Sequence, residues 1–267
     1  MTTPILLDIT DGIARITLNR PDKGNALDQA MADALFDAVV RCANDRQVRC
    51  VVLTGAGKMF CVGGDIGEFF ANGDAIAPFL ARLAGTLHQA MSQFATMKKP
   101  LVTLVNGTAA GAGLSMAISG DIVLADPSAL FTTAYLGIGL TPDGGMTWLL
   151  PRLVGMRTAQ DMIITNRRLD ATEAAAIGLI TRVAAPGTLM AEGNEIAARL
   201  STGAVAAMGH ARRLLHDSFN SGFASQMDRE LASITAAGDG PEGREGIAAF
   251  LDRRKPDFQT GSSSLFT

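Results

Sequence analysis

The sequence predicts an α/β fold in which mainly parallel strands alternate with helices, followed by a helical C-terminal third. Two observations carry this prediction. Short apolar runs that are typical of buried strands alternate with segments of helical periodicity as far as residue 148. Beyond Trp148 the apolar residues recur almost only at helical spacing. In such a fold the functional loops are expected at the carboxyl ends of the parallel strands.

The first elements follow from local signals. The segment ILLDITDGIARITL, residues 5–18, has two apolar runs around Asp11-Gly12, a pair that hairpin turns favour. It is therefore expected to form a β-hairpin. Asp28 is a suitable N-cap for a helix whose apolar residues follow at helical spacing, and CVVLTG (50–55) is typical of a buried strand.

The alternation of helix and strand then continues. A long helix, with apolar residues at helical spacing from Leu80 to Phe94, stops near Pro100 and precedes the strand LVTLVNG (101–107). A small-residue loop next runs into a short helix near Gly113, and DIVLAD (121–126) is the following strand.

Composition places the chain among globular proteins and excludes several partners. The 267 residues are 48% hydrophobic, which is ample for a large core. A formal net charge of −3 gives no reason to expect a nucleic acid or an anionic membrane as partner, and no apolar run approaches the roughly 18 residues of a membrane span. The three cysteines lack metal-ligand spacing and the N-terminal residues lack a secretory pattern. We therefore expect a cytoplasmic protein without a metal site.

Two glycine-rich loops, residues 57–69 and 105–117, each follow a predicted strand. Both could bring free backbone N–H groups close to an oxygen of a ligand. The alternative is that small residues only let two backbones pack closely. A dinucleotide site is disfavoured, because Met116 stands where the third glycine of that motif belongs.

Asp143 is the one charge in the apolar, glycine-rich stretch GIGLTPDGGMTW (137–148). The simple interpretation is an N-cap, because two glycines and then an apolar helical run follow it.

Five motifs in order resemble the crotonase superfamily of enoyl-CoA hydratases and isomerases. They are NRPDKGNAL, VVLTGAGKMFCVGGDIGEF, VNGTAAGAGLSMAISGDIVLAD, GIGLTPDGGMTWLLPRLVG and EGIAAFLDRRKPDF, and the match spans roughly residues 13–258. The resemblance implies a crotonase-like spiral of ββα units over residues 1–200 and a helical trimerisation region over 201–258. It also implies an acyl-CoA thioester substrate, a homotrimer or hexamer, and no cofactor other than the coenzyme A of the substrate. Residues 259–267 are expected to be a frayed tail.

The resemblance also assigns catalytic roles. The oxyanion hole would consist of the backbone N–H groups of Gly64 and Ala112. The two glutamates of the hydratases are replaced here by Ser115 and Tyr135, whereas Asp143 matches the lone acid of isomerases, most closely those of phenylacetate-pathway type. We therefore predict an enoyl-CoA isomerase. The alternatives are an enoyl-CoA hydratase and a non-catalytic acyl-CoA-binding homologue.

Further contacts are implied for the coenzyme and the acyl group. The resemblance places Lys23, Ala26, Leu27, Asp65 and Ile66 against coenzyme A, with Phe250 and Lys255 supplied by a neighbouring subunit. The segment that contains Phe69, Phe70 and Phe79 is expected to cover an apolar acyl pocket. His88 matches a catalytic histidine of aryl-CoA dehalogenases, although a lone histidine on a mostly apolar helix is more often a packed or surface residue.

Overall fold

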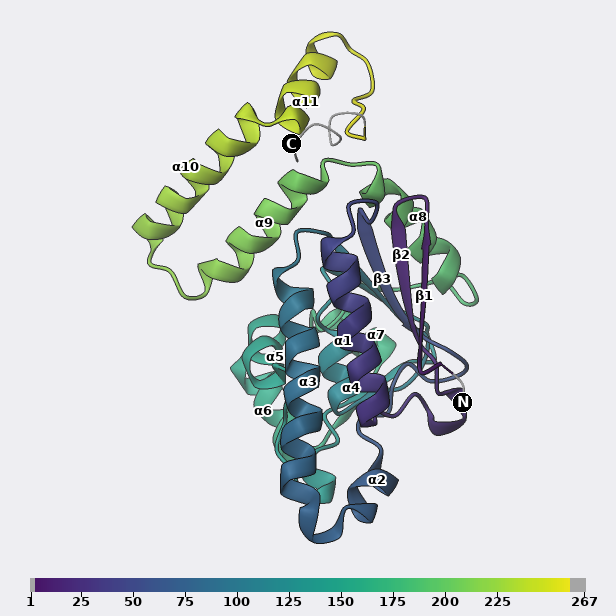
Figure 1. Ribbon diagram of the computed structural model, residues 1–267. Coiled ribbons are helices and arrows are strands. Elements are labelled where there is room, and N and C mark those ends of the chain that lie inside the picture. The colour runs from purple at the N-terminus through teal and green to yellow at the C-terminus, as the bar shows by residue number, and fades with distance from the viewer. Residues whose placement is uncertain (1–2, 260–267) are drawn as a thin grey trace.

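A computed structural model describes residues 3–259. It contains a six-stranded sheet, a smaller three-stranded sheet, helices around both, and a helical extension at the C-terminal end (Figure 1). In the large sheet, β1 (Ile5–Thr10) pairs antiparallel with β2 (Ile13–Leu18), and the parallel strands that follow in space are β3 (Cys50–Gly55), β4 (Leu101–Val105), β6 (Ile122–Ala125) and β9 (Arg182–Val183). The predicted α/β fold with mainly parallel strands is confirmed.

The predicted hairpin turn has the backbone that its sequence favours. Asp11 and Gly12 have φ values of 52° and 77°, and a type I′ turn requires positive φ at both central residues. Asp28 also behaves as predicted, because its carboxylate accepts a hydrogen bond from Met31 N at the start of α1 (Gln29–Asn44).

Both faces of the large sheet are covered. On one face, Val51 and Leu53 belong to the main core with α1 and with α3 (Ile76–Thr96). On the other face, Cys50 and Val52 pack in a second cluster that includes residues of α8 (Leu189–Ser201). Alternate residues of one strand thus face two cores, which explains why CVVLTG reads as a continuous apolar run.

The small sheet includes a segment of the second glycine-rich loop. It consists of β5 (Ala109–Ala110), β7 (Leu130–Thr132) and β8 (Arg168–Asp170). Five further short helices lie between the strands along the chain: α2 (Ile66–Ala71), α4 (Ala112–Ala117), α5 (Met146–Val154), α6 (Met156–Thr165) and α7 (Ala171–Ala176). Of these, α4 and α7 connect the small sheet to the large one.

The last three helices extend away from the sheets (Figure 1). They are α9 (Val205–Ser218), α10 (Phe223–Asp239) and α11 (Pro241–Leu251). None of the α10 side chains is buried, although four large apolar ones lie along it: Phe223, Met227, Leu231 and Ile234. The predicted tail lies outside the described residues except for Gln259. No described helix combines the length and the apolar character that a membrane crossing requires.

Candidate active site

The two glycine-rich loops lie side by side. Cys61 N donates to Thr108 O at 3.1 Å, and Ala110 N donates to Cys61 O at 2.9 Å. A Cβ atom on Gly113 would lie only 2.1 Å from Cys61 O, so the second loop can approach the first only with glycine there. The close-packing interpretation of these glycines therefore holds, and the packing brings the two loops to one cavity.

Gly64 and Ala112 both line this cavity. Next to Gly64, Leu27 N donates to Gly63 O at 2.7 Å and Asp65 N donates to Leu27 O at 2.8 Å, which fixes the chain on both sides of Gly64. Ala112 is the first residue of α4, where a backbone N–H has no partner within the helix. Within residues 3–259, neither the Gly64 N–H nor the Ala112 N–H has a hydrogen-bond acceptor. Two unused donors thus border the same space.

The cavity has a volume of about 390 Å³ and is mostly apolar. Phe69 of α2 and Leu80, Leu83 and Leu87 of α3 contribute much of its wall. Of the residues predicted to cover an acyl pocket, Phe69 lines the cavity, Phe79 packs edge-on against Phe69, and Phe70 points into solvent. Among the described residues that line the cavity, Asp143 is the only one with a carboxylate.

The predicted N-cap role of Asp143 is wrong. α5 begins at Met146 with Gly145 as its N-cap, and the Asp143 side chain does not cap the helix. The reason is the turn itself. Gly144 and Gly145 have φ values of 63° and 81°, so Met146 N bonds to the main-chain oxygen of Asp143 and the carboxylate is left for the cavity.

Three side chains hold the Asp143 turn. The Tyr135 hydroxyl donates to Asp143 Oδ1 at 2.6 Å, and the Ser115 hydroxyl donates to the main-chain oxygen of Asp143 at 2.9 Å. On the adjacent residue, Gly144 N donates to His88 Nε2 at 3.1 Å. The two residues at the predicted glutamate positions, Ser115 and Tyr135, therefore both contact Asp143, which the sequence alone did not reveal.

Tyr135 acts as a hydrogen-bond donor in this arrangement. Burial and the neighbouring Asp143 carboxylate both raise the pKa of its hydroxyl well above the usual range. The phenol consequently keeps its proton at neutral pH, and Asp143 carries the only carboxylate among the described residues that line the cavity.

His88 is not among the residues that line the cavity. It lies on the far side of the Asp143 turn, in a groove of about 700 Å³ that also contains Trp148 and Phe219. Because Nε2 accepts the Gly144 N–H, the nitrogen that a base would use is already occupied. The geometry gives His88 the role of holding the turn.

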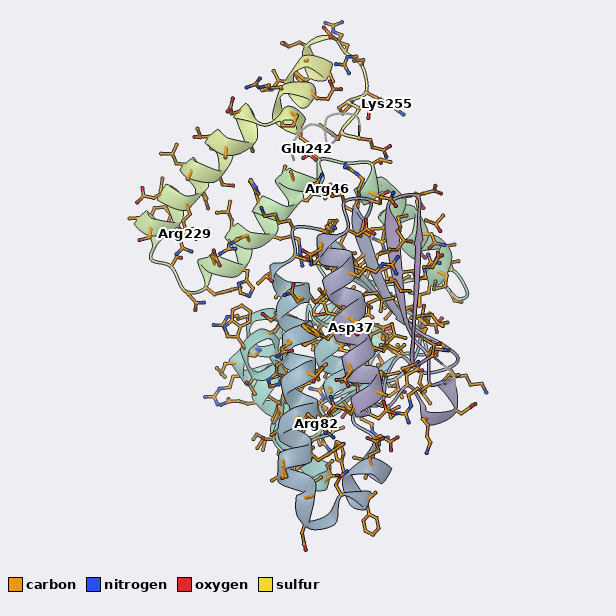
Figure 2. All side chains as sticks on the ribbon, viewed as in Figure 1. Asp37, Arg46, Arg82, Arg229, Glu242 and Lys255 are labelled. Atoms are coloured by element: carbon orange, nitrogen blue, oxygen red, sulfur yellow. The ribbon has the colours of Figure 1, made fainter. Side chains whose placement is uncertain are left out.

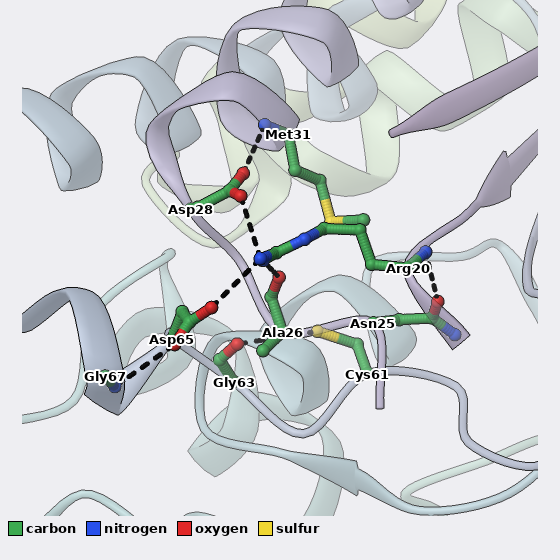
Figure 3. A network of polar contacts seen from close by, with 9 residues as sticks. All are labelled: Arg20, Asn25, Ala26, Asp28, Met31, Cys61, Gly63, Asp65 and Gly67. Atoms are coloured by element: carbon green, nitrogen blue, oxygen red, sulfur yellow. Dashed lines mark hydrogen bonds and ion pairs between the residues drawn. The ribbon is translucent and has the colours of Figure 1, made fainter. Parts of the chain in front are cut away.

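A polar network lies next to the cavity residues Leu27 and Gly64, and the sequence prediction missed its central residue, Arg20 (Figure 3). Arg20 Nη2 lies 3.0 Å from carboxylate oxygens of both Asp28 and Asp65, and Arg20 Nη1 donates to Ala26 O. Although burial works to raise the pKa of Asp65, the hydrogen bond and charge of Arg20 hold it below the usual value. The network ties α1 to the start of α2.

Asn25 completes the network and was also missed. It is fully buried with a φ of 56°, its Oδ1 accepts from Arg20 N, and its Nδ2 donates to the main-chain oxygens of Ala56 and Met59. The signal that could have found it is the asparagine after Gly24, because Asn tolerates a left-handed backbone better than most residues.

The residues predicted to contact coenzyme A fall into two groups. Leu27 and Ile66 line the cavity, Ala26 and Asp65 are buried beside it, and Lys23 is exposed on the short 3₁₀ turn Pro21–Lys23. Phe250 on α11 is 83% exposed and Lys255 follows that helix, at the opposite end of the molecule from α2 (Figures 1 and 2). A single chain does not bring the second group to its own cavity.

The described residues of this site provide neither a cluster of metal ligands nor a reactive thiol. Throughout the described chain, no three His, Cys, Asp or Glu side chains come close enough together to hold a metal ion. Cys61 lies in the first loop, but it is fully buried, and this burial raises the pKa of its thiol to about 12. A thiol in that state is a poor nucleophile at neutral pH.

Several known proteins resemble this chain in sequence and in fold. A family model described as enoyl-CoA hydratase/isomerase matches residues 8–261. The chain is 34% identical to the 1,2-epoxyphenylacetyl-CoA isomerase of Escherichia coli and 36% identical to the crotonyl-CoA hydratase of Syntrophomonas wolfei, in each case over 95% of this chain and 97% of the other. The crystal structure of an enoyl-CoA hydratase from Polaromonas sp. JS666 superposes with a TM-score of 0.90 at 31% identity, over 95% of this chain and 98% of that one.

Proposed function

Because the chain belongs to the enoyl-CoA hydratase/isomerase family of enzymes, we propose that it is an enoyl-CoA isomerase in which Asp143 moves a proton between two carbons of the substrate. The resemblance drawn from the sequence and the crotonase-like fold are confirmed. The family relationship covers hydratases and isomerases alike, so the choice of reaction depends on the cavity.

The observation that carries the proposal is the single carboxylate. Addition of water to a double bond requires groups that hold the water and take its proton, and the resemblance assigns that work to two glutamates. Ser115 and Tyr135 occupy those positions, and neither is a base at neutral pH. A 1,3 proton shift requires one base and no water.

The proposed reaction uses Asp143 twice. Its carboxylate takes a proton from carbon 2 of a 3-enoyl thioester. The electrons of that C–H bond form a double bond between carbons 1 and 2, and the carbonyl π electrons move onto the carbonyl oxygen to give an enolate. The N–H groups of Gly64 and Ala112 stabilise the negative oxygen, a contribution of about 3 kcal/mol for each donor in comparable sites. Asp143 then returns the proton to carbon 4, and the double bond ends between carbons 2 and 3.

The test is incubation with a 3-enoyl-CoA and, separately, with the conjugated 2-enoyl-CoA. The 3-enoyl substrate is expected to gain the absorbance of a conjugated thioester, with little 3-hydroxyacyl-CoA formed over the same period. Hydration of the 2-enoyl substrate as fast as isomerisation or faster would favour the hydratase, a reaction that the similarity to the crotonyl-CoA hydratase keeps open. Absence of both products, with acyl-CoA still bound, would indicate a non-catalytic homologue.

The same proposal puts coenzyme A at the edge of the cavity, against Lys23, Ala26, Leu27, Asp65 and Ile66. Lys23 is exposed and can meet a phosphate, while the Arg20 network keeps the main chain of Ala26 and Asp65 in place. Phe250 and Lys255 can reach such a site only from a second chain, since in their own chain they lie on and just after α11, at the opposite end from α2 (Figures 1 and 2). The site is therefore completed by assembly.

Assembly into trimers, or pairs of trimers, is expected from the exposed apolar stripe of α10. Phe223, Met227, Leu231 and Ile234 recur at helical spacing and leave a face that is unusual for an isolated helix in water. Leu231→Asp should convert the assembly to monomers in light scattering and weaken coenzyme A binding with it. Ser225→Asp is the matched control, because a spacing of two residues puts Ser225 and Phe223 on opposite faces. A wild-type monomer at micromolar concentration would contradict the expectation.

A further inference from the structure

Tyr135 is the residue that contacts the carboxylate of the proposed base directly. Its hydroxyl lies 2.6 Å from Asp143 Oδ1, a short hydrogen bond between two oxygens. Tyr135 is only 9% exposed, and both Tyr135 and Asp143 line the acyl cavity. The bond therefore lies where the proton transfer is proposed.

The other contacts to the turn act on its main chain. Ser115 reaches the main-chain oxygen of Asp143, and His88 accepts from the main-chain N–H of Gly144. Neither restrains rotation of the Asp143 side chain. Among the described residues, Tyr135 alone donates a hydrogen bond to a carboxylate oxygen of Asp143.

Tyr135 is itself held firmly. Its N–H donates to Thr133 O at 2.8 Å, and its main-chain oxygen accepts from both Ile138 N and Leu140 N at 3.1 Å. The preceding residue, Ala134, has a φ of 57°, a left-handed conformation that is uncommon for alanine and marks a backbone under constraint. The ring is thus presented to Asp143 by a rigid segment.

We propose that Tyr135 is a positioning residue that determines which oxygen of Asp143 carries the proton. With Oδ1 bound to the phenol, Oδ2 is the oxygen left to exchange a proton with carbons 2 and 4. This inference rests on the proposed function, since it assigns to Tyr135 an effect on Asp143 as a base.

The first test is Tyr135→Phe, which keeps the ring and removes the hydroxyl. We expect kcat for isomerisation of a 3-enoyl-CoA to fall about tenfold or more, in line with the loss of a hydrogen bond to a charged group. KM should change by less than about twofold. The acid limb of the pH profile of kcat/KM should differ from that of the wild type, because the carboxylate that acts as the base loses its hydrogen-bond donor. Ser119→Ala is the matched control: it removes a hydroxyl that donates to Met116 O outside the acyl cavity.

A double substitution separates positioning from support of the fold. In an Asp143→Asn background, adding Tyr135→Phe should lower the residual rate by less than about twofold, because Tyr135 acts through the carboxylate that is already absent. A merely structural role would lower the rate by the same factor in both backgrounds, and that result would overturn the inference. If Asp143→Asn abolishes turnover while Tyr135→Phe changes neither kcat nor the pH profile, the inference fails and the proposed function stands. If Asp143→Asn turns over like the wild type, both fail.

Spectroscopy offers a readout that does not require a variant at position 135. Tyr135 is the only tyrosine in the sequence, so replacing tyrosine by 3-fluorotyrosine during expression labels this position alone. The single ¹⁹F resonance should shift between the wild type and Asp143→Asn, and in the wild type it should titrate with the midpoint of the acid limb of kcat/KM. A resonance that ignores both changes would overturn the inference even if Tyr135→Phe failed to fold.

Discussion

Asp143→Asn is expected to lower isomerase turnover at least about a hundredfold while leaving the fold and coenzyme A affinity nearly unchanged. The substitution removes the only carboxylate that lines the cavity among the described residues. The geometry should survive, because the asparagine carbonyl can still accept from the Tyr135 hydroxyl and the main-chain contacts of Ser115 and His88 are untouched. The measurement is the initial rate with a 3-enoyl-CoA, alongside the thermal midpoint and the Kd for coenzyme A.

Asp8→Asn provides the matched control for this substitution. Asp8 is exposed on β1 and, among the described residues, accepts only a local hydrogen bond from Thr10, so exchange of its carboxylate for an amide should leave turnover at the wild-type level. Turnover of Asp143→Asn within a factor of a few of the wild type would reject Asp143 as the base. Equal losses in both variants would point to a general effect of charge.

The parts of the fold that could be predicted are those that local chemistry decides. The Asp11-Gly12 turn and the Asp28 cap depend on one or two residues and on the backbone that they prefer. The small sheet was not predicted, because β5 has only two residues and carries no periodicity. Its existence depends on the pairing of Ala109 and Ala110 with β7, which is a tertiary contact.

The candidate site was predicted in its chemistry and only partly in its contacts. A lone carboxylate among apolar residues and glycines is visible in the sequence, whereas the bond between Tyr135 and Asp143 depends on the path of the chain between them. The Arg20 network is harder still, because Asp65 is 45 positions away along the chain. The N-cap interpretation of Asp143 failed because the positive φ values of Gly144 and Gly145 turn the main-chain oxygen of Asp143, and not its carboxylate, toward the first N–H of the helix. Residue type alone does not reveal these φ values.

Gly64→Ala is expected to lower kcat/KM about a hundredfold, the effect of losing one oxyanion donor of about 3 kcal/mol. The backbone itself allows alanine, because the φ of Gly64 lies outside the left-handed region. The obstacle is a neighbour: a Cβ atom at this position would lie 2.3 Å from Cζ of Phe69. Phe69 packs edge-on against Phe79 with ring centroids 6.0 Å apart, so its ring cannot simply retreat. Either the ring moves into the acyl cavity or the loop that carries the Gly64 N–H moves away.

The double variant Gly64→Ala with Phe69→Ala tests this cause directly. Removing the ring gives the new methyl group space, so the loop can return to its place and kcat/KM should recover at least about tenfold relative to Gly64→Ala alone. Phe69→Ala by itself measures how much the lost wall of the cavity contributes. Because the two residues are in contact, the effects of the two substitutions should not add. Gly64→Ala with nearly wild-type activity would show that the Phe69 ring yields to the new methyl group while the loop keeps its place, which would contradict the expected loss. A double variant without recovery would place the defect in the main chain of the loop.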